Sequence, residues 1–124
     1  MLFRSPLAPS TINALVIAPH TLPCSYVLHT VGPIVSGRLT KMHCNELSYC
    51  YRSCLKLAAD SGLKSIAFCC ISTGVFHFPQ NKAAEIAVQT VQDYLKEDDR
   101  IERVVFNVFK EEDYSIYRRL LGYR

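Results

Sequence analysis

Short apolar runs alternate with longer stretches in which apolar residues recur every three or four positions, and this alternation limits the fold more than any other feature. The clearest unit joins the unbroken apolar run 66–71 to the helical stretch 79–96 through a short loop. Strands that alternate with helices of this length form right-handed crossovers. The sequence therefore predicts an α/β fold with a mainly parallel sheet and helices outside it.

The expected elements follow one another in the order β–β–α–β–α–β–α, after an irregular lead-in at residues 1–12. β-branched and aromatic residues mark the strands, and a helical apolar period marks the helices. The first strand is expected at a sheet edge because a proline follows it, and Gly62 is expected to cap the first helix. The expected strands are Ala14–Ile17, 26–31, 66–71 (buried on both faces) and 104–109 (also buried), and the expected helices are 44–60, 79–96 and 112–121.

Length, composition and charge narrow the class of protein. The 124 residues are enough for one small domain. No apolar run approaches the ~20 residues of a membrane-spanning helix, so no membrane partner is expected. The formal net charge of +3, from 14 Lys and Arg against 11 Asp and Glu, is too small to indicate nucleic-acid binding. This mild positive charge suits an anionic small molecule.

Six cysteines occur at irregular spacing, and two of them, Cys69 and Cys70, lie inside an apolar run. Such cysteines usually pack as small buried hydrophobic residues. Reduced thiols and a cytoplasmic location are therefore expected. Cys50 and Cys54 share the apolar face of the first helix, so we predict that they pack in the core. A zinc site would instead need close cysteine pairs in loops or knuckles.

The segment between the run 66–71 and the following helix is the candidate ligand site. In open α/β sheets, ligands bind beyond the carboxyl ends of the strands, and a helix N-terminus attracts anions. Gly74 allows a close backbone approach, and Ser72 and Thr73 add hydroxyl donors. The segment lacks the lysine of a Walker loop and has a single glycine, so it matches neither common nucleotide loop. These residues alone leave an anion site and a plain structural connection equally open.

Four segments, in order, resemble the macrodomain superfamily of ADP-ribose-binding proteins. The string at 71–79 (Ile-Ser-Thr-Gly-Val-Phe-His-Phe-Pro) resembles the macrodomain diphosphate loop, and the string at 26–33 resembles a second macrodomain signature. The segments 50–55 and 105–109 also match in order. Phe-His-Phe-Pro at 76–79, in place of the usual Tyr-Gly-Tyr-Pro, is similar to bacterial zinc-dependent macrodomains, which are protein-ADP-ribose hydrolases.

The resemblance implies a three-layer α/β/α fold with a mainly parallel mixed sheet, in which residues 13–124 form the C-terminal portion of a macrodomain. It implies that the loop backbone wraps the diphosphate, that Gly74 to Phe76 also line the distal ribose, and that Asn107 to Phe109, at the end of the last strand, lie near the ligand. Phe109 either stacks on adenine or belongs to the core. The implied ADP-ribose-binding residues are Ser72, Thr73, Gly74, Val75, Phe76, Asn107 and Phe109.

The resemblance also places three family segments before residue 1: an Asn-Ala-Ala-Asn segment, an adenine-reading Asp and a Cys/His/Cys zinc loop. We therefore expect a macrodomain truncated at its N-terminus, with no catalytic residue, metal ligand or cofactor assigned in this chain. Zinc is expected in an intact family member. An open sheet edge would make such a chain marginally stable, so self-association or pairing with a complementing chain is expected.

The expected function is ADP-ribose binding, of the type that removes ADP-ribose from proteins, with ADP-ribose or an ADP-ribosylated protein as partner. The sequence leaves open whether this chain is itself an enzyme. A non-catalytic ADP-ribose- or diphosphate-binding module and an inactive fragment without the zinc loop are the alternatives. His77 lies in the ligand loop and could act as a general acid or base, but a solvent-facing loop residue is the preferred interpretation.

Overall fold

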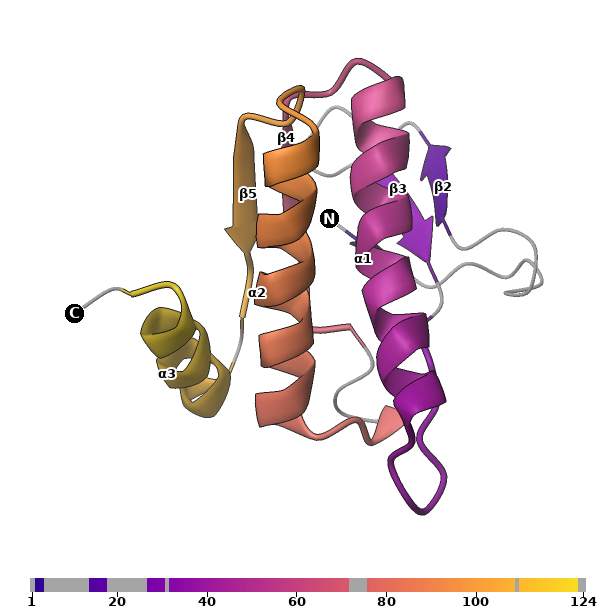
Figure 1. Ribbon diagram of the computed structural model, residues 1–124, viewed down its shortest axis with the longest axis vertical. Coiled ribbons are helices and arrows are strands. Elements are labelled where there is room, and N and C mark those ends of the chain that lie inside the picture. The colour runs from indigo at the N-terminus through magenta and orange to yellow at the C-terminus, as the bar shows by residue number, and fades with distance from the viewer. Residues whose placement is uncertain are drawn as a thin grey trace.

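The computed structural model describes residues 2–3, 14–17, 27–30, 32–71, 76–108 and 110–122 (Figure 1). Strands and helices alternate after Thr40, and the predicted α/β class is confirmed. The elements are β1 (Leu2–Phe3), β2 (Ala14–Ile17), β3 (Val27–Thr30), α1 (Lys41–Asp60), β4 (Ser65–Phe68), α2 (Gln80–Glu97), β5 (Arg103–Phe106) and α3 (Glu111–Leu120).

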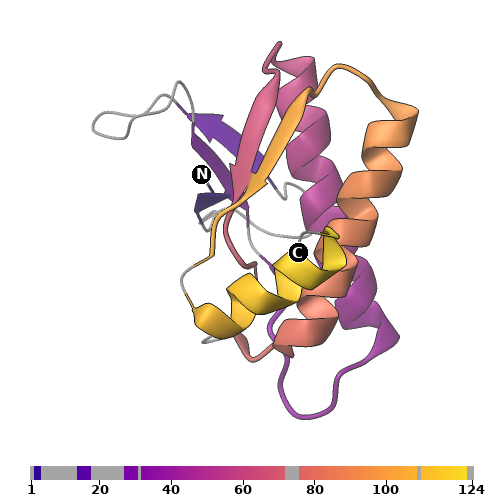
Figure 2. The ribbon, with the colours of Figure 1, turned by 90° about the vertical axis from the view of Figure 1, so that its left-hand side faces the viewer.

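The described strands form two sheets, one with the order β1-β3-β2 and one that pairs β4 with β5. β3 lies parallel to β1 and antiparallel to β2, and β4 lies parallel to β5. Among the described strands, β2 lies at an edge, as predicted. β1 was not predicted, because two residues in a segment broken by prolines give no strand period. α1 and α2 lie side by side on one face of the strands, and α3 packs against α2 (Figure 2).

The core lies between α1, α2 and β4. The predicted apolar stripe of α1 is confirmed, because each of its residues is buried. The stripe meets the sheet where the ring of Tyr51 lies 4.9 Å from the ring of Phe68. α2 presents small residues to α1, and the Ser48 and Thr90 hydroxyls share a 2.9 Å hydrogen bond between the two helices. The buried stripe of α1 consists of Leu47, Cys50, Tyr51, Cys54, Leu55, Ala58 and Ala59.

α1 begins three residues earlier than predicted, because Thr40 and His43 form a capping box. The Thr40 side chain accepts from the His43 backbone N–H at 3.3 Å, and His43 Nδ1 accepts from the Thr40 N–H at 3.1 Å. Capping boxes usually carry Glu or Gln at this third helical position. Histidine in that role gave no recognisable signal in the sequence.

Two strands are less buried than predicted. In β4, Ile66 and Phe68 are buried, but Ala67 between them is only half-buried. In β5, Arg103 and Val105 are exposed, with 38% of Val105 accessible to solvent. The prediction of a buried strand at 104–109 is wrong for this face, because no described element covers it. None of the helices in the described part of the chain is both long and apolar enough to cross a membrane.

The end of α1 offers a test of this fold. Gly62 has a φ of +79°. The Gly62 N–H donates to the Ala59 carbonyl at 3.0 Å, and the Leu63 N–H donates to the Ala58 carbonyl at 2.9 Å. This pair of hydrogen bonds is a Schellman cap. A Cβ at Gly62 would meet no atom, so Gly62→Ala strains only the backbone. We expect the free energy of unfolding in urea to fall by about 1 kcal/mol.

Gly122→Ala is the matched control, because Gly122 has a φ of +80° at the end of the last helix. A chain end can fray to relieve the strain, so this variant should lose less stability. Equal stability of Gly62→Ala and the unchanged chain would contradict the assigned cap.

Candidate anion-binding site

The carboxyl ends of β4 and β5 meet at one edge of the parallel pair. Phe68 pairs with Phe106 at the last register position, and the backbone N–H of Asn107 donates to the Phe68 carbonyl at 2.7 Å. Asn107 therefore lies beside the point where β4 leads into the predicted ligand loop, and it is exposed. The loop residues from Ser72 to Val75 are not among the described residues, so a ligand contact by Asn107 stays a prediction.

The middle of the predicted ligand loop, with Ser72, Thr73, Gly74 and Val75, lies outside the described residues, as does Phe109. Their roles stay predictions. The structure does describe the residues on both sides of the loop: Ile71 before it is 6% exposed, and Phe76 after it is 7% exposed. Both ends of the loop are therefore fixed in the core.

After the loop, the chain alternates between the core and solvent. Phe76 and Phe78 are buried, whereas His77 between them is exposed. The predicted solvent-facing position of His77 is confirmed. The backbone N–H of Val35 donates to the carbonyl of Phe76 at 2.9 Å and joins the end of the loop to the segment that follows β3.

The backbone of His77 adopts the left-handed conformation, with a φ of +62°. This region favours glycine, although histidine occurs there more often than most side chains. Glycine stands at this position in the Tyr-Gly-Tyr-Pro form of the loop. The backbone turn that the usual glycine would allow is thus also made here, with histidine in its place.

α2 begins directly after this turn, and its N-terminus has no side-chain cap. Pro79 occupies the N-cap position without a capping hydrogen bond, and the first turn contains no acidic residue. Lys82, in that first turn, is exposed. The first-turn N–H groups have no carbonyl partner within a helix, so this end of α2 carries a partial positive charge. No carboxylate of the first turn competes with an external anion for it.

The side chain of Tyr51 packs against Phe68, the last residue of β4. Its hydroxyl interacts with the Tyr117 hydroxyl and with the backbone of Ile71, the residue before the loop. Burial raises the pKa of both phenols, so both are neutral hydrogen-bonding groups at physiological pH. The Tyr117 hydroxyl also interacts with the Cys70 thiol. The last residues before the loop are therefore fixed by side chains from α1 and α3.

Cys50 and Cys54 of α1 are core residues, as predicted. Cys50 is 3% exposed and Cys54 is fully buried. Burial raises the pKa of the Cys50 thiol to about 11 and raises that of Cys54 further, so neither supplies a thiolate at neutral pH. Within the described ranges, no three His, Cys, Asp or Glu side chains are grouped so that they could hold a metal ion. The residues present there do not fit a zinc site.

Sequence reasoning missed two features that shape the site. The interaction between Tyr51 and Ile71 joins residues 20 positions apart, and the Val35–Phe76 hydrogen bond joins residues 41 positions apart. Neither pair has a local pattern. The left-handed turn at His77 did leave a signal, since histidine stands there in place of the usual glycine, but that signal was interpreted only as a mark of subclass.

The parallel β4–β5 pair and the uncapped start of α2 define an α/β protein with a candidate anion site between a strand and a helix. The Macro domain family matches residues 8–87, well over half of the chain. The chain belongs to the macrodomain family. The predicted resemblance and the predicted α/β macrodomain fold are both confirmed.

The relatives and solved structures that the chain resembles are longer than the chain itself. A protein-ADP-ribose hydrolase of Treponema medium is 56% identical over 112 residues, which make up 90% of this chain and 43% of that protein. An Oceanobacillus iheyensis macrodomain with ADP is 38% identical, with a TM-score of 0.82, and the match covers 89% of this chain and 57% of that one. A Trypanosoma brucei macrodomain in complex with ADP-ribose is 38% identical, with a TM-score of 0.80, over 88% of this chain and 45% of that one.

Replacing Tyr51 tests how the strand end is held. Tyr51→Phe keeps the ring but leaves the buried groups of Tyr117 and Ile71 without this partner. We expect the free energy of unfolding to fall by about 1–3 kcal/mol and the amide of Ile71 to exchange faster with solvent. Tyr49→Phe on the same helix, at a side chain that is 57% exposed, should change neither measurement. Unchanged exchange at Ile71 in Tyr51→Phe would contradict the anchoring role.

Proposed function

We propose that this chain binds ADP-ribose, with the diphosphate held by the backbone of the loop from Ser72 to Phe76. The observation that carries the proposal is the uncapped, acid-free start of α2 directly after a loop whose two ends are fixed in the core. Family membership supports the proposal, since a macrodomain of similar fold is in complex with ADP-ribose. ADP-ribose or an ADP-ribosylated protein is thus the proposed partner.

The physical basis is the match between a compact anion and fixed N–H groups. Gly74 has no side chain to keep the backbone away from phosphate oxygens, and Ser72 and Thr73 can donate hydroxyl hydrogen bonds. Because the loop ends are already ordered, binding costs less conformational entropy than closing a free loop around the ligand. Asn107, beside the loop, and Phe109 are the proposed further contacts at the end of β5.

Removal of ADP-ribose from proteins is the second candidate function. It is favoured by the similarity to the Treponema medium relative, a protein-ADP-ribose hydrolase that is 56% identical over the matched 112 residues. The match spans 43% of that protein. Hydrolysis by this chain is therefore a proposal, and the site residues named above do not include a catalytic one. The described residues offer no metal-binding group, and we derive no catalytic step through zinc.

Calorimetric titration with ADP-ribose tests the binding proposal. Titration of the unchanged chain should give a heat signal that fits one binding site. Gly74→Val should weaken binding at least about tenfold, a loss of about 1.4 kcal/mol of binding free energy. The reason is that a branched side chain would stand where the diphosphate approaches. Ser115→Val, at an exposed position of α3, is the control and should bind as the unchanged chain does. Absence of binding at millimolar ADP-ribose, or equal binding by Gly74→Val, would refute the proposed site.

Hydrolysis is tested separately by the release of ADP-ribose from a modified protein, with zinc and with a chelator. Release that requires zinc supports the zinc-dependent subclass. Release that persists in the chelator refutes the zinc requirement, and the absence of release in both conditions supports a binding module without turnover.

A further inference from the structure

The two long helices place their N-terminal ends side by side. Ser48 of α1 shares a 2.9 Å hydrogen bond with Thr90 of α2. Further along both helices, Arg52 pairs with Glu97, so α1 and α2 run in the same direction. Both begin at the end of the molecule toward which β5 points and where the segment 32–40 lies (Figure 1). The first turns of α1 and α2 are therefore neighbours at the ligand-loop end.

This end of the molecule is rich in basic groups. Neither the segment 32–45 nor the segment 76–84 contains an Asp or a Glu. Arg38 and Lys41 flank the N-cap of α1, and Lys82 lies in the first turn of α2. All three side chains are exposed. We call Arg38, Lys41 and Lys82 the basic rim.

The charges of the basic rim are not balanced within the described part of the chain. None of its three side chains forms an ion pair there, and the first carboxylates on the two helices, Glu46 and Glu85, come only in the second turns. At the opposite end of the same helices, Arg52, Lys56 and Arg100 each pair with a carboxylate, at distances between 2.7 and 3.1 Å. The two helix N-termini add partial positive charge to the rim. An external group with negative charge is therefore attracted to this end.

Exposed apolar side chains stand beside these charges. Met42, next to Lys41, is 68% exposed, and Ile34 is 53% exposed. Val35 joins this segment to the ligand loop, because it is buried and its N–H donates to the carbonyl of Phe76 at 2.9 Å. Methionine and arginine are both enriched in protein–protein interfaces. The mixture of basic and apolar groups thus fits a protein surface better than a free nucleotide.

We propose that the basic rim, together with Ile34 and Met42, docks the protein part of an ADP-ribosylated partner through acidic residues that flank the modified one. This role of the rim rests on the proposed function, because ADP-ribose in the ligand loop would bring the partner to this end of the molecule. Carboxylates then pair with the guanidinium and ammonium groups. Since ADP-ribose and the protein part are joined, the second contact forms at a high effective concentration, and weak surface ion pairs suffice to select a partner.

Two ADP-ribosylated peptides that differ only in charge test this docking surface. Both carry ADP-ribose on a central residue through a linkage that resists hydrolysis. Aspartates flank this residue in one peptide, and asparagines of similar shape flank it in the other. Calorimetric titration of the unchanged chain should show about fivefold tighter binding of the aspartate peptide, because each exposed ion pair contributes modestly. The preference should shrink as the salt concentration is raised.

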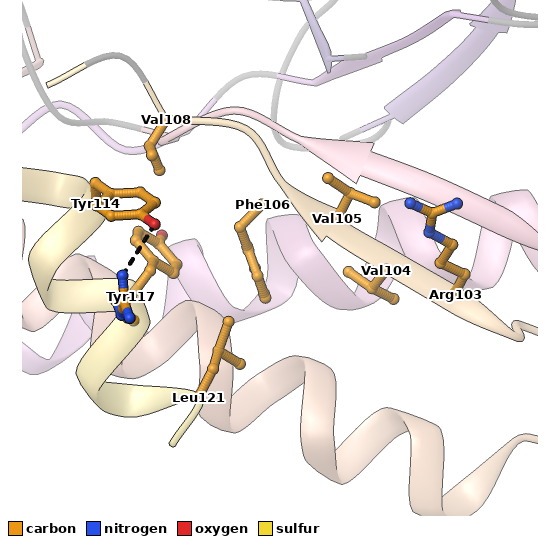
Figure 3. A pocket seen from close by; sticks show the side chains of 9 residues that line it. Arg103, Val104, Val105, Phe106, Val108, Tyr114, Tyr117 and Leu121 are labelled. Atoms are coloured by element: carbon orange, nitrogen blue, oxygen red, sulfur yellow. Dashed lines mark hydrogen bonds between the residues drawn. The ribbon is translucent and has the colours of Figure 1, made fainter. Parts of the chain in front are cut away.

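Charge reversal on the rim gives the matched comparison. Arg38→Glu/Lys41→Glu should weaken binding of the aspartate peptide at least about tenfold, because repulsion replaces attraction, and should abolish the preference for aspartate. The control is Lys64→Glu/Arg103→Glu, which also replaces one arginine and one lysine at exposed positions and changes the net charge equally. Lys64 precedes β4 and Arg103 begins β5, and Figure 3 shows Arg103 far from Val108, which follows the carboxyl end of β5. This control should keep the preference.

Replacing Met42 separates docking of a protein from attraction by charge alone. Met42→Ser should weaken binding of both peptides about threefold and leave binding of free ADP-ribose unchanged, because only a peptide would cover this side chain. Tyr49→Ser is the control: Tyr49 is 57% exposed and lies further along α1, so its replacement should change none of these affinities. Circular dichroism and thermal melting would show that all variants are folded.

Equal binding of the two peptides by the unchanged chain overturns the docking surface. Equal losses in the two double variants also overturn it, because they would reflect net charge alone. Full binding of both peptides by Met42→Ser contradicts the apolar contact. Free ADP-ribose distinguishes the two levels of failure. A chain that binds it without a preference for aspartate refutes only the docking surface, whereas a chain that binds no ADP-ribose refutes the proposed function and the docking surface with it.

Discussion

The burial of Tyr51 between α1 and the end of β4 is the constraint on which the rest of the structure depends. The side chain is 1% exposed, and its ring packs on Phe68 at 4.9 Å. A buried hydroxyl without a partner costs about 1–3 kcal/mol, so this position requires partners that lie far away in the sequence. Tyr117 and the backbone of Ile71 supply them. One side chain thereby joins the first helix, the last helix and the strand that leads into the ligand loop.

The same constraint explains why the loop can be a site. With Ile71 held on one side, and Phe76 and Phe78 buried on the other, the chain between them is short and fixed at both ends. The turn at His77 then delivers the backbone to α2 in the left-handed conformation. Backbone N–H groups that are ordered before a ligand arrives can bind an anion at a lower entropic cost. Core residues therefore fix both ends of the proposed ligand loop.

Local patterns predicted the helices well and the strands less well. The apolar stripes of α1 and α2 depend on a three- and four-residue period that each helix carries in its own sequence. The start of α1 was missed because His43, and not glutamate, completes the capping box with Thr40. The anchoring of Ile71 by Tyr51 could not be predicted, because no local pattern records which distant groups meet. The loop itself was identified by its position between a strand and a helix and by its resemblance to macrodomains.

The error on β5 follows from a general limit of hydrophobic patterns. A run such as Val104-Val105-Phe106 shows that a strand can be covered on both faces, but it does not say which element covers it. β4 and β5 are both apolar, yet Val105 is 38% exposed among the described residues. The apolar pattern of β5 therefore predicted that a strand forms there, but not which of its faces the described part of the chain covers.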